Sequence, residues 1–334
     1  MKPMIVLLLV VTTACEVGIT HDSEKPQEDT SEEVVVNEET IDEEVDEEAE
    51  DSAEPESIEE EDDEPLADFS QWGPHYPYGI TKESRTAVVT NCSSMEYEVY
   101  TPYTDNPPVV ILGHGFARGS GVMAGWAEHL SSWGVEVLLP TLCHYNVFAG
   151  VDHEMNGQNM RELAAVHGAT SVVYAGHSAG GLAAIIAASQ DPTAAGVLGL
   201  DATDTDDVPG VPDLIGTGYA GSVTAPAFSI QGEPSSCNAE NNGLNLFRMM
   251  SDYTAVKVTS ADHCDFENPT DMMCTMSCEN SSSSFEDSEI RSAITTLGTA
   301  AVMSMTAIST DGTGWWDDEG LELWIQSGLI QGLE

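Results

Sequence analysis

The chain has 334 residues, which is long enough for one large domain with extensions. Its formal net charge is −49, from 58 acidic and 9 basic side chains. Such a surface repels phosphate backbones and anionic headgroups, which excludes nucleic acid and bare anionic membranes as partners.

Residues 1–15 have the layout of an export signal. Lys2 supplies the positive end, residues 4–11 form a short apolar core, and small residues lead to Cys15. The apolar run is too short to span a bilayer, so the sequence predicts a signal peptide. Because it ends on Cys15, the segment resembles a bacterial lipoprotein signal, which implies a lipidated Cys15 and an outer-membrane or cell-surface location. Thr12, where that signal usually has leucine, keeps ordinary secretion open.

Residues 16–68 contain 26 acidic side chains, a single lysine and almost no aromatic residues. A segment of this composition cannot bury enough apolar area to offset the loss of chain entropy. We therefore expect a disordered acidic linker that tethers the domain at 69–334 and, if Cys15 is lipidated, holds it away from the membrane.

Short apolar strands alternate with helices through residues 69–334. The sequence predicts antiparallel strands within 74–102 and further strands within 107–115, 135–142, 171–178, 195–204, 225–233 and 253–263. It predicts helices within 121–134, 157–168, 180–190 and 288–308, and a closing segment at 317–330. Alternation of this kind predicts an α/β domain with a mostly parallel sheet covered by helices on both faces.

The stretch Gly176-His177-Ser178-Ala179-Gly180 has the pattern G-x-S-x-G. A predicted strand precedes it and a small-residue helix follows, which is the setting that exposes a nucleophilic serine on a sharp turn. A glycine-rich helix start that matched the motif by chance would account for the glycines, but it would not account for the strand predicted directly before them. We therefore predict that Ser178 is a nucleophile.

A nucleophilic serine needs a base and an acid that orients the base. His263 follows the last predicted central strand, at the sheet edge where doubly wound proteins gather functional residues. Two carboxylates compete for the acid: Asp201 ends the strand after Ser178, and Glu233 ends the next one. We favour Asp201 and keep Glu233 as the alternative. Structural roles are expected for most other histidines, namely His114, His129, His144, His153 and His167.

The glycine-rich loop after residues 107–113 is the candidate for the oxyanion hole, the set of backbone donors that binds the oxygen of an attacked carbonyl group. Its glycines allow backbone N–H groups to face a substrate oxygen, and the donors we predict are the N–H groups of Phe116 and Ala179.

With these parts assembled, residues 75–310 resemble serine α/β-hydrolases of the chlorophyllase, platelet-activating-factor acetylhydrolase and cutinase-like group, without a large lid. The resemblance is carried by His114-Gly115-Phe116, Gly176–Gly180, Leu200-Asp201 and Asp262-His263. It implies hydrolysis of carboxylic esters through an acyl-enzyme, with no cofactor, and it too assigns the acid to Asp201. The acidic tether, the extra cysteines and the tail with Trp315 and Trp316 depart from the group and leave the substrate open.

Six cysteines remain after Cys15: Cys92, Cys143, Cys237, Cys264, Cys274 and Cys278. An even number in an exported chain predicts disulfides. Six cysteines allow 15 pairings, and the sequence leaves the choice open; a local Cys274–Cys278 bond and a Cys237–Cys264 bond between two late loops are two candidates. Without CxxC or HxxxH spacing, we expect no metal site.

The sequence thus predicts an exported, monomeric serine esterase that acts on a lipid, a small ester or a polyester. A peptidase or acyltransferase would use the same three residues, because fold and triad do not fix the acyl acceptor. The alternative hypothesis, from a different functional class, is a surface domain that binds a ligand and is catalytically idle.

Overall fold

The computed structural model describes residues 78–146, 150–204, 214–278, 284–309 and 311–333. The predicted signal peptide, Cys15 and the acidic linker lie outside the described residues.

A nine-stranded sheet forms the centre of the domain, in the order β1-β2-β4-β3-β7-β8-β9-β10-β11. The six strands from β4 to β10 are mutually parallel, and β1, β2 and β11 pair antiparallel at the two edges. The strands are β1 (Ile80–Val89), β2 (Cys92–Pro102), β3 (Val109–Gly113), β4 (Glu136–Pro140), β7 (Val172–His177), β8 (Ala194–Leu200), β9 (Ala227–Gln231), β10 (Tyr253–Val258) and β11 (Ile330–Gly332). A separate two-stranded ladder joins β5 (Tyr145–Asn146) to β6 (Gly150–Val151).

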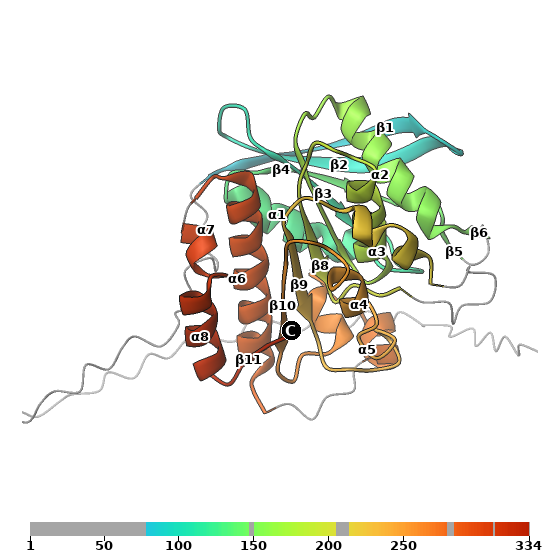
Figure 1. Cartoon of the computed structure of the whole chain (residues 1–334). Coiled ribbons are helices and arrows are strands. Elements are labelled where there is room, and N and C mark those ends of the chain that lie inside the picture. The colour runs from blue at the N-terminus through green and yellow to red at the C-terminus, as the bar shows by residue number, and fades with distance from the viewer. Residues whose placement is uncertain (1–77, 147–149, 205–213, 279–283, 310, 334) are drawn as a thin grey trace, which may run out of the picture. The chain divides into compact units, whose positions relative to one another are not determined.

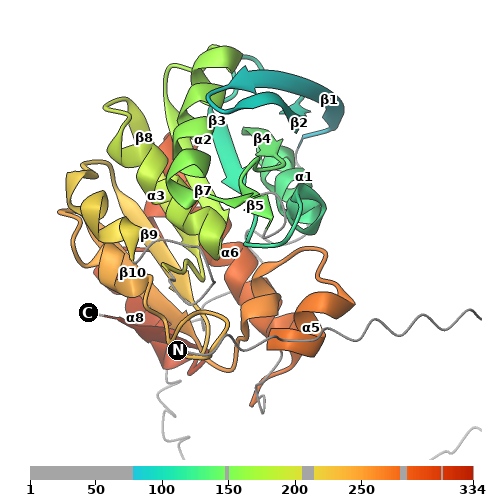
Figure 2. The ribbon, with the colours of Figure 1, turned by 90° about the vertical axis from the view of Figure 1, so that its right-hand side faces the viewer.

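Helices cover both faces of the sheet (Figure 1). One layer contains α1 (Ala124–Ser132), α6 (Asp287–Thr306), α7 (Asp311–Gly314) and α8 (Asp318–Gln326). The other contains α2 (His153–His167) and α3 (Ala179–Ser189), which run side by side (Figure 2), and α4 (Leu244–Phe247). Helix α5 (Met272–Cys278) and the short 3-10 helices η1 (Ser120–Met123), η2 (Ile215–Gly218), η3 (Ala220–Ser222) and η4 (His263–Phe266) lie in the connections.

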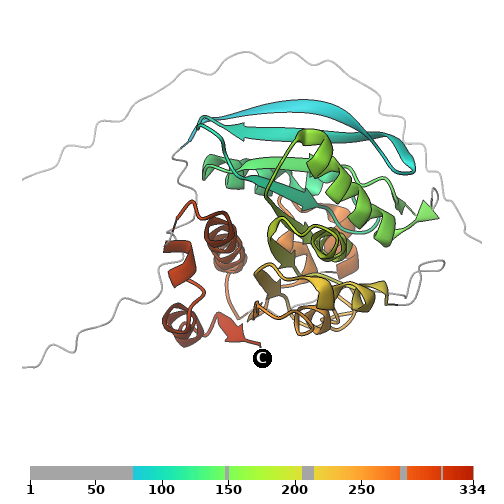
Figure 3. The same cartoon turned by 45° about the horizontal axis from the view of Figure 1, so that its top comes forward.

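The alternation of side chains along each strand explains the two layers. In β3, Val110 and Leu112 pack into the core beneath α1 and α6, whereas Val109 and Ile111 pack beneath α2 and α3. Central strands with both faces covered need apolar residues at every position, and β3 is buried throughout. The edge pair β1–β2, at the top of Figure 3, is less covered: residues 80–86 of β1 are exposed or half-buried, and exposed and buried residues alternate only near the turn that joins the two strands.

The predicted α/β architecture with a mostly parallel sheet is confirmed. Helix α2 begins four residues earlier than expected, because the Asp152 side chain caps it by accepting the N–H of Met155. Helix α5 was not predicted, since its sequence MMCTMSC has no clear polar face. The Asp271 carboxylate accepts the N–H groups of Met273 and Cys274 and so starts α5.

Three disulfides join Cys92 to Cys143, Cys237 to Cys278 and Cys264 to Cys274. The expected disulfides are present, but neither of the two candidate pairs forms. Cys274 and Cys278 are one turn apart on α5, and side chains four residues apart on a helix are stacked alongside one another rather than pointed at each other. Each therefore bonds to a cysteine of a different loop. The three disulfides indicate an oxidising, extracellular compartment.

No helix within the described ranges is long and apolar enough to cross a membrane.

Candidate active site

Ser178 stands on a sharp turn between β7 and α3. Its backbone has φ 56° and ψ −125°, a strained conformation for a residue with a side chain. The turn is tight enough that a Cβ on Gly176 would collide with the carbonyl of Gly180, and a Cβ on Gly180 would collide with the carbonyl of Gly113. Gly176 is therefore required by the close approach of the chain within the turn, and Gly180 by the packing of the turn against β3.

His263 and Asp201 come from the carboxyl ends of two other parallel strands. Asp201 directly follows β8, and His263 begins η4 shortly after β10. The His263 Nδ1 lies 2.6 Å from the Asp201 Oδ2, and both side chains are buried. A carboxylate in this position fixes the imidazole with its proton on Nδ1, which leaves Nε2 free to accept a proton.

Two further donors hold the Asp201 carboxylate in place. The Gly232 N–H donates to Oδ1 over 3.0 Å, and the Asn238 Nδ2 donates to Oδ2 over 3.1 Å. Asn238 is fully buried. Its role was missed by sequence reasoning, because it lies 37 residues from Asp201 in a segment without a recognisable motif. Buried carboxylates are stable as anions only when their oxygens are hydrogen-bonded in this way.

The alternative acid, Glu233, has other partners. Its Oε2 lies 2.7 Å from the Lys257 Nζ, and its Oε1 accepts the Ser260 N–H over 3.0 Å. The carboxylate that bonds His263 is therefore that of Asp201, the one we favoured.

A pocket of about 390 Å³ brings the predicted residues together. Its lining includes Ser178, His263, Phe116, Ala179 and, on α5, Met273. Among the described residues, the backbone N–H groups of Phe116 and Ala179 find no hydrogen-bond acceptor. They are the two donors expected to hold an oxyanion, and both belong to residues that line the same pocket as Ser178.

Neutral histidines surround these residues. The His114 Nδ1–H donates to the Gly115 carbonyl, and Nε2 accepts the Leu142 N–H, which holds the loop after β3. His153 stacks edge-on against Phe116. Burial lowers the pKa of both His114 and His153 from 6.5 to about 4.

His177, the variable residue of the G-x-S-x-G motif, contacts both the backbone and the ring of His263. Its Nε2–H donates to the His263 carbonyl over 3.0 Å, and the two ring centroids are 4.4 Å apart. Burial, and secondarily the proximity of His263, lowers the pKa of His177 well below its usual value. His177 is thus a neutral support for His263, a role that the motif alone did not indicate.

A buried ion pair forms part of the pocket wall. Arg118 donates from Nε and Nη2 to the two carboxylate oxygens of Glu267, both over 2.7 Å, and Glu267 is fully buried. The same Nη2 lies 2.8 Å from the Asp271 Oδ1. This pair ties the loop after β3 to the chain that follows η4, so that both sides of the pocket are fixed.

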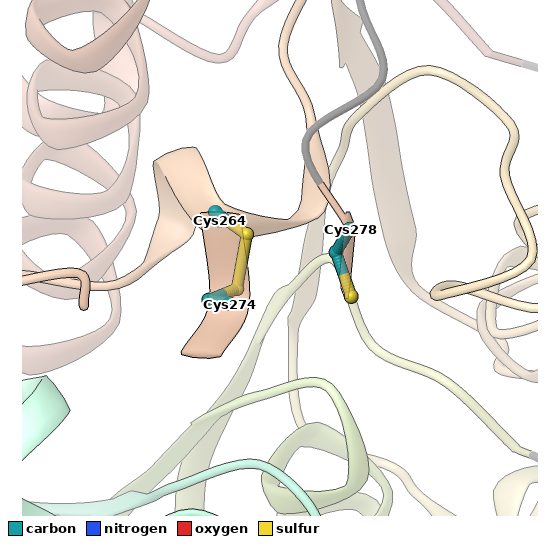
Figure 4. Close-up of side chains that lie close together, drawn as sticks. All are labelled: Cys264, Cys274 and Cys278. Atoms are coloured by element: carbon teal, nitrogen blue, oxygen red, sulfur yellow. A yellow bond between two sulfur atoms is a disulfide. The ribbon is translucent and has the colours of Figure 1, made fainter. Parts of the chain in front are cut away.

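Two of the three disulfides involve cysteines that are next to His263 and Asn238 in the sequence. Cys264 follows His263 and bonds Cys274 of α5, and Cys237 precedes Asn238 and bonds Cys278 of α5. The Sγ atoms of Cys264, Cys274 and Cys278 lie within 4.8 Å of one another (Figure 4), a separation at which thiolates could hold a metal ion. All three sulfurs are engaged in disulfides, however, and a metal needs the thiolate form.

No protein-family model matches the chain, and no curated protein matches it. The interpretation of the site therefore depends on its geometry.

Replacing Gly180 by alanine would drive a methyl group into the Gly113 backbone. We expect the free energy of unfolding to fall by roughly 3 kcal/mol, because overpacking here shifts the backbone. Gly119→Ala is the matched control, since a Cβ there meets no atom within 4 Å, and its effect should stay within about 0.5 kcal/mol. Guanidinium unfolding followed by tryptophan fluorescence measures both. Equal unfolding midpoints for the two variants would contradict the described turn.

The buried neutral histidines predict a specific pH dependence. His114 binds a proton near pH 6.5 in the unfolded chain but only near pH 4 in the folded one, so its contribution to stability is lost as the pH falls through this window. Between pH 7 and pH 5, His114→Gln should therefore lose less unfolding free energy than the wild type, by roughly 2 kcal/mol. Guanidinium unfolding of both proteins at pH 7 and pH 5 tests this. All other titrating groups are the same in the two proteins, so their effects cancel in the comparison. Parallel losses in the two proteins would show that His114 is not held neutral.

Proposed function

We propose that the chain is a serine hydrolase that cleaves carboxylic esters. The observation that carries the proposal is the 2.6 Å contact between the His263 Nδ1 and the buried Asp201 carboxylate, in the pocket lined by Ser178. A serine on a strained turn, a histidine with Nε2 free and a buried carboxylate make up the set needed for nucleophilic acyl transfer.

In the proposed reaction, the Ser178 Oγ attacks the ester carbonyl carbon while the His263 Nε2 accepts its proton. The carbonyl oxygen becomes an oxyanion, which the N–H groups of Phe116 and Ala179 stabilise. The intermediate collapses as His263 returns the proton to the leaving alcohol, and Ser178 keeps the acyl group. A water molecule, deprotonated by His263, then releases the acid and regenerates the serine. Asp201 stabilises the imidazolium formed in each half-reaction.

The sheet order supports an α/β-hydrolase fold for this domain, with kinship to the chlorophyllase, acetylhydrolase and cutinase-like group. The parallel strands follow the order β4-β3-β7-β8-β9-β10, and Ser178, Asp201 and His263 follow β7, β8 and β10. Loops at the carboxyl ends of parallel strands meet at one edge of the sheet. No part of this mechanism requires a cofactor.

We also propose that the protein acts outside the cytoplasm. The three disulfides support this location, and the amino-terminal pattern that ends at Cys15 supports a lipid anchor. Metabolic labelling with a radioactive fatty acid, compared between the wild type and Cys15→Ser, would test the anchor.

Hydrolysis of dissolved p-nitrophenyl butyrate by the purified full chain tests the proposed activity. Ser178→Ala should lower kcat about a millionfold, since it removes the nucleophile. Asp201→Asn should lower kcat about ten-thousandfold, because the imidazole loses its orientation and its counter-charge. Glu233→Gln, the matched control at the other carboxylate, should stay within about threefold of the wild type. A folded wild-type protein that releases no p-nitrophenol would contradict the proposal and favour the idle binding domain.

A further inference from the structure

Helix α5 places three exposed methionines beside the pocket. Met272, Met273 and Met276 are 74%, 60% and 81% exposed, among the most exposed large apolar side chains in the described part of the chain. Met273 also lines the pocket with Ser178 and His263. The apolar surface of α5 is therefore continuous with the proposed active site.

This apolar surface is also uncharged. Helix α5 contains no ionisable side chain, because both of its cysteines are in disulfides, in a protein whose net charge is −49. The preceding Asp271 pairs with Arg118, which also pairs with Glu267, so these three groups together carry one net negative charge. Exposed apolar groups concentrated next to a pocket, in a strongly acidic protein, mark an interaction surface rather than ordinary solvent-facing residues.

The two disulfides hold α5 in a fixed position relative to the triad. Cys274 is bonded to the neighbour of His263, and Cys278 is bonded to the neighbour of Asn238. An apolar partner that contacts Met272 and Met276 therefore lies beside the opening of the pocket without any rearrangement of α5. Because α5 is already fixed, the entropic cost of binding is lower.

The charges within the pocket indicate a neutral partner. Arg118 is the only lysine or arginine among the described lining residues, and both Glu267 and Asp271 already pair with it. No cation remains in this lining for a carboxylate or phosphate group. Methionine side chains are unbranched and flexible, and they pack well against alkyl chains of variable shape.

We infer that α5 docks the protein on the surface of an aggregated neutral lipid ester, an acylglycerol droplet, so that an acyl chain passes Met273 into the pocket. This inference rests on the proposed ester hydrolysis and names its substrate class. Met272 and Met276 contact the droplet, whereas Ser178 and His263 act on the ester carbonyl.

The test compares one substrate in an aggregate with another in solution, using the full chain. In Met272→Ser/Met276→Ser, the rate on emulsified triolein should fall at least about tenfold, because two apolar contacts with the droplet are lost. The rate on dissolved p-nitrophenyl butyrate should stay within about twofold, since neither side chain lines the pocket. The control Val166→Ser/Ile325→Ser removes two exposed apolar side chains from α2 and α8, and it should retain both rates.

Adsorption to triolein droplets is measured separately by flotation, in the Ser178→Ala background, so that binding does not depend on turnover. The bound fraction should fall with the α5 substitutions and not with the control substitutions. Equal loss in both double variants, or no loss in either, would overturn the docking role of α5. Absence of hydrolysis of the dissolved ester by the wild type would instead contradict the proposed activity, and flotation would still report on α5.

Discussion

The contact between His263 and Asp201 is the interaction on which the rest of the site depends. A carboxylate buried this deeply needs partners for each oxygen, and the Gly232 N–H, the Asn238 amide and the His263 imidazole supply them. The Asp201 carboxylate follows β8, and its partners come from the two loops that follow β9 and β10. The parallel sheet is what brings those loops together, because the carboxyl ends of its strands lie at one edge.

The surroundings of this contact are held together by a hydrogen bond, an ion pair and a disulfide. His177 holds the His263 backbone, the Arg118–Glu267 pair closes one wall, and the Cys264–Cys274 disulfide fixes the residue next to His263. Groups that stabilise a developing charge act best when they are already in place before the reaction. Disulfides also hold α5, so that its exposed methionines and the pocket form one surface.

The central sheet and the positions of Ser178, Asp201 and His263 could be predicted because each depends on local pattern: buried strands, and residues directly after them. Asn238, His177 and the Arg118–Glu267 pair could not be assigned roles, since their partners are set by how separate loops pack. The disulfide pairing failed for a related reason. Cys274 and Cys278 looked like a local pair only because α5 was not predicted, and a helix points them at different loops.

The central claim, that Ser178 is a nucleophile activated through His263 and Asp201, is tested most directly by covalent labelling. A fluorophosphonate probe is incubated with the native full chain, and the adduct is located by peptide mass spectrometry. The account predicts one adduct, on Ser178, that forms far more slowly in Asp201→Asn and is absent after denaturation. A folded native protein that stays unlabelled, or carries the label on another residue, would contradict it.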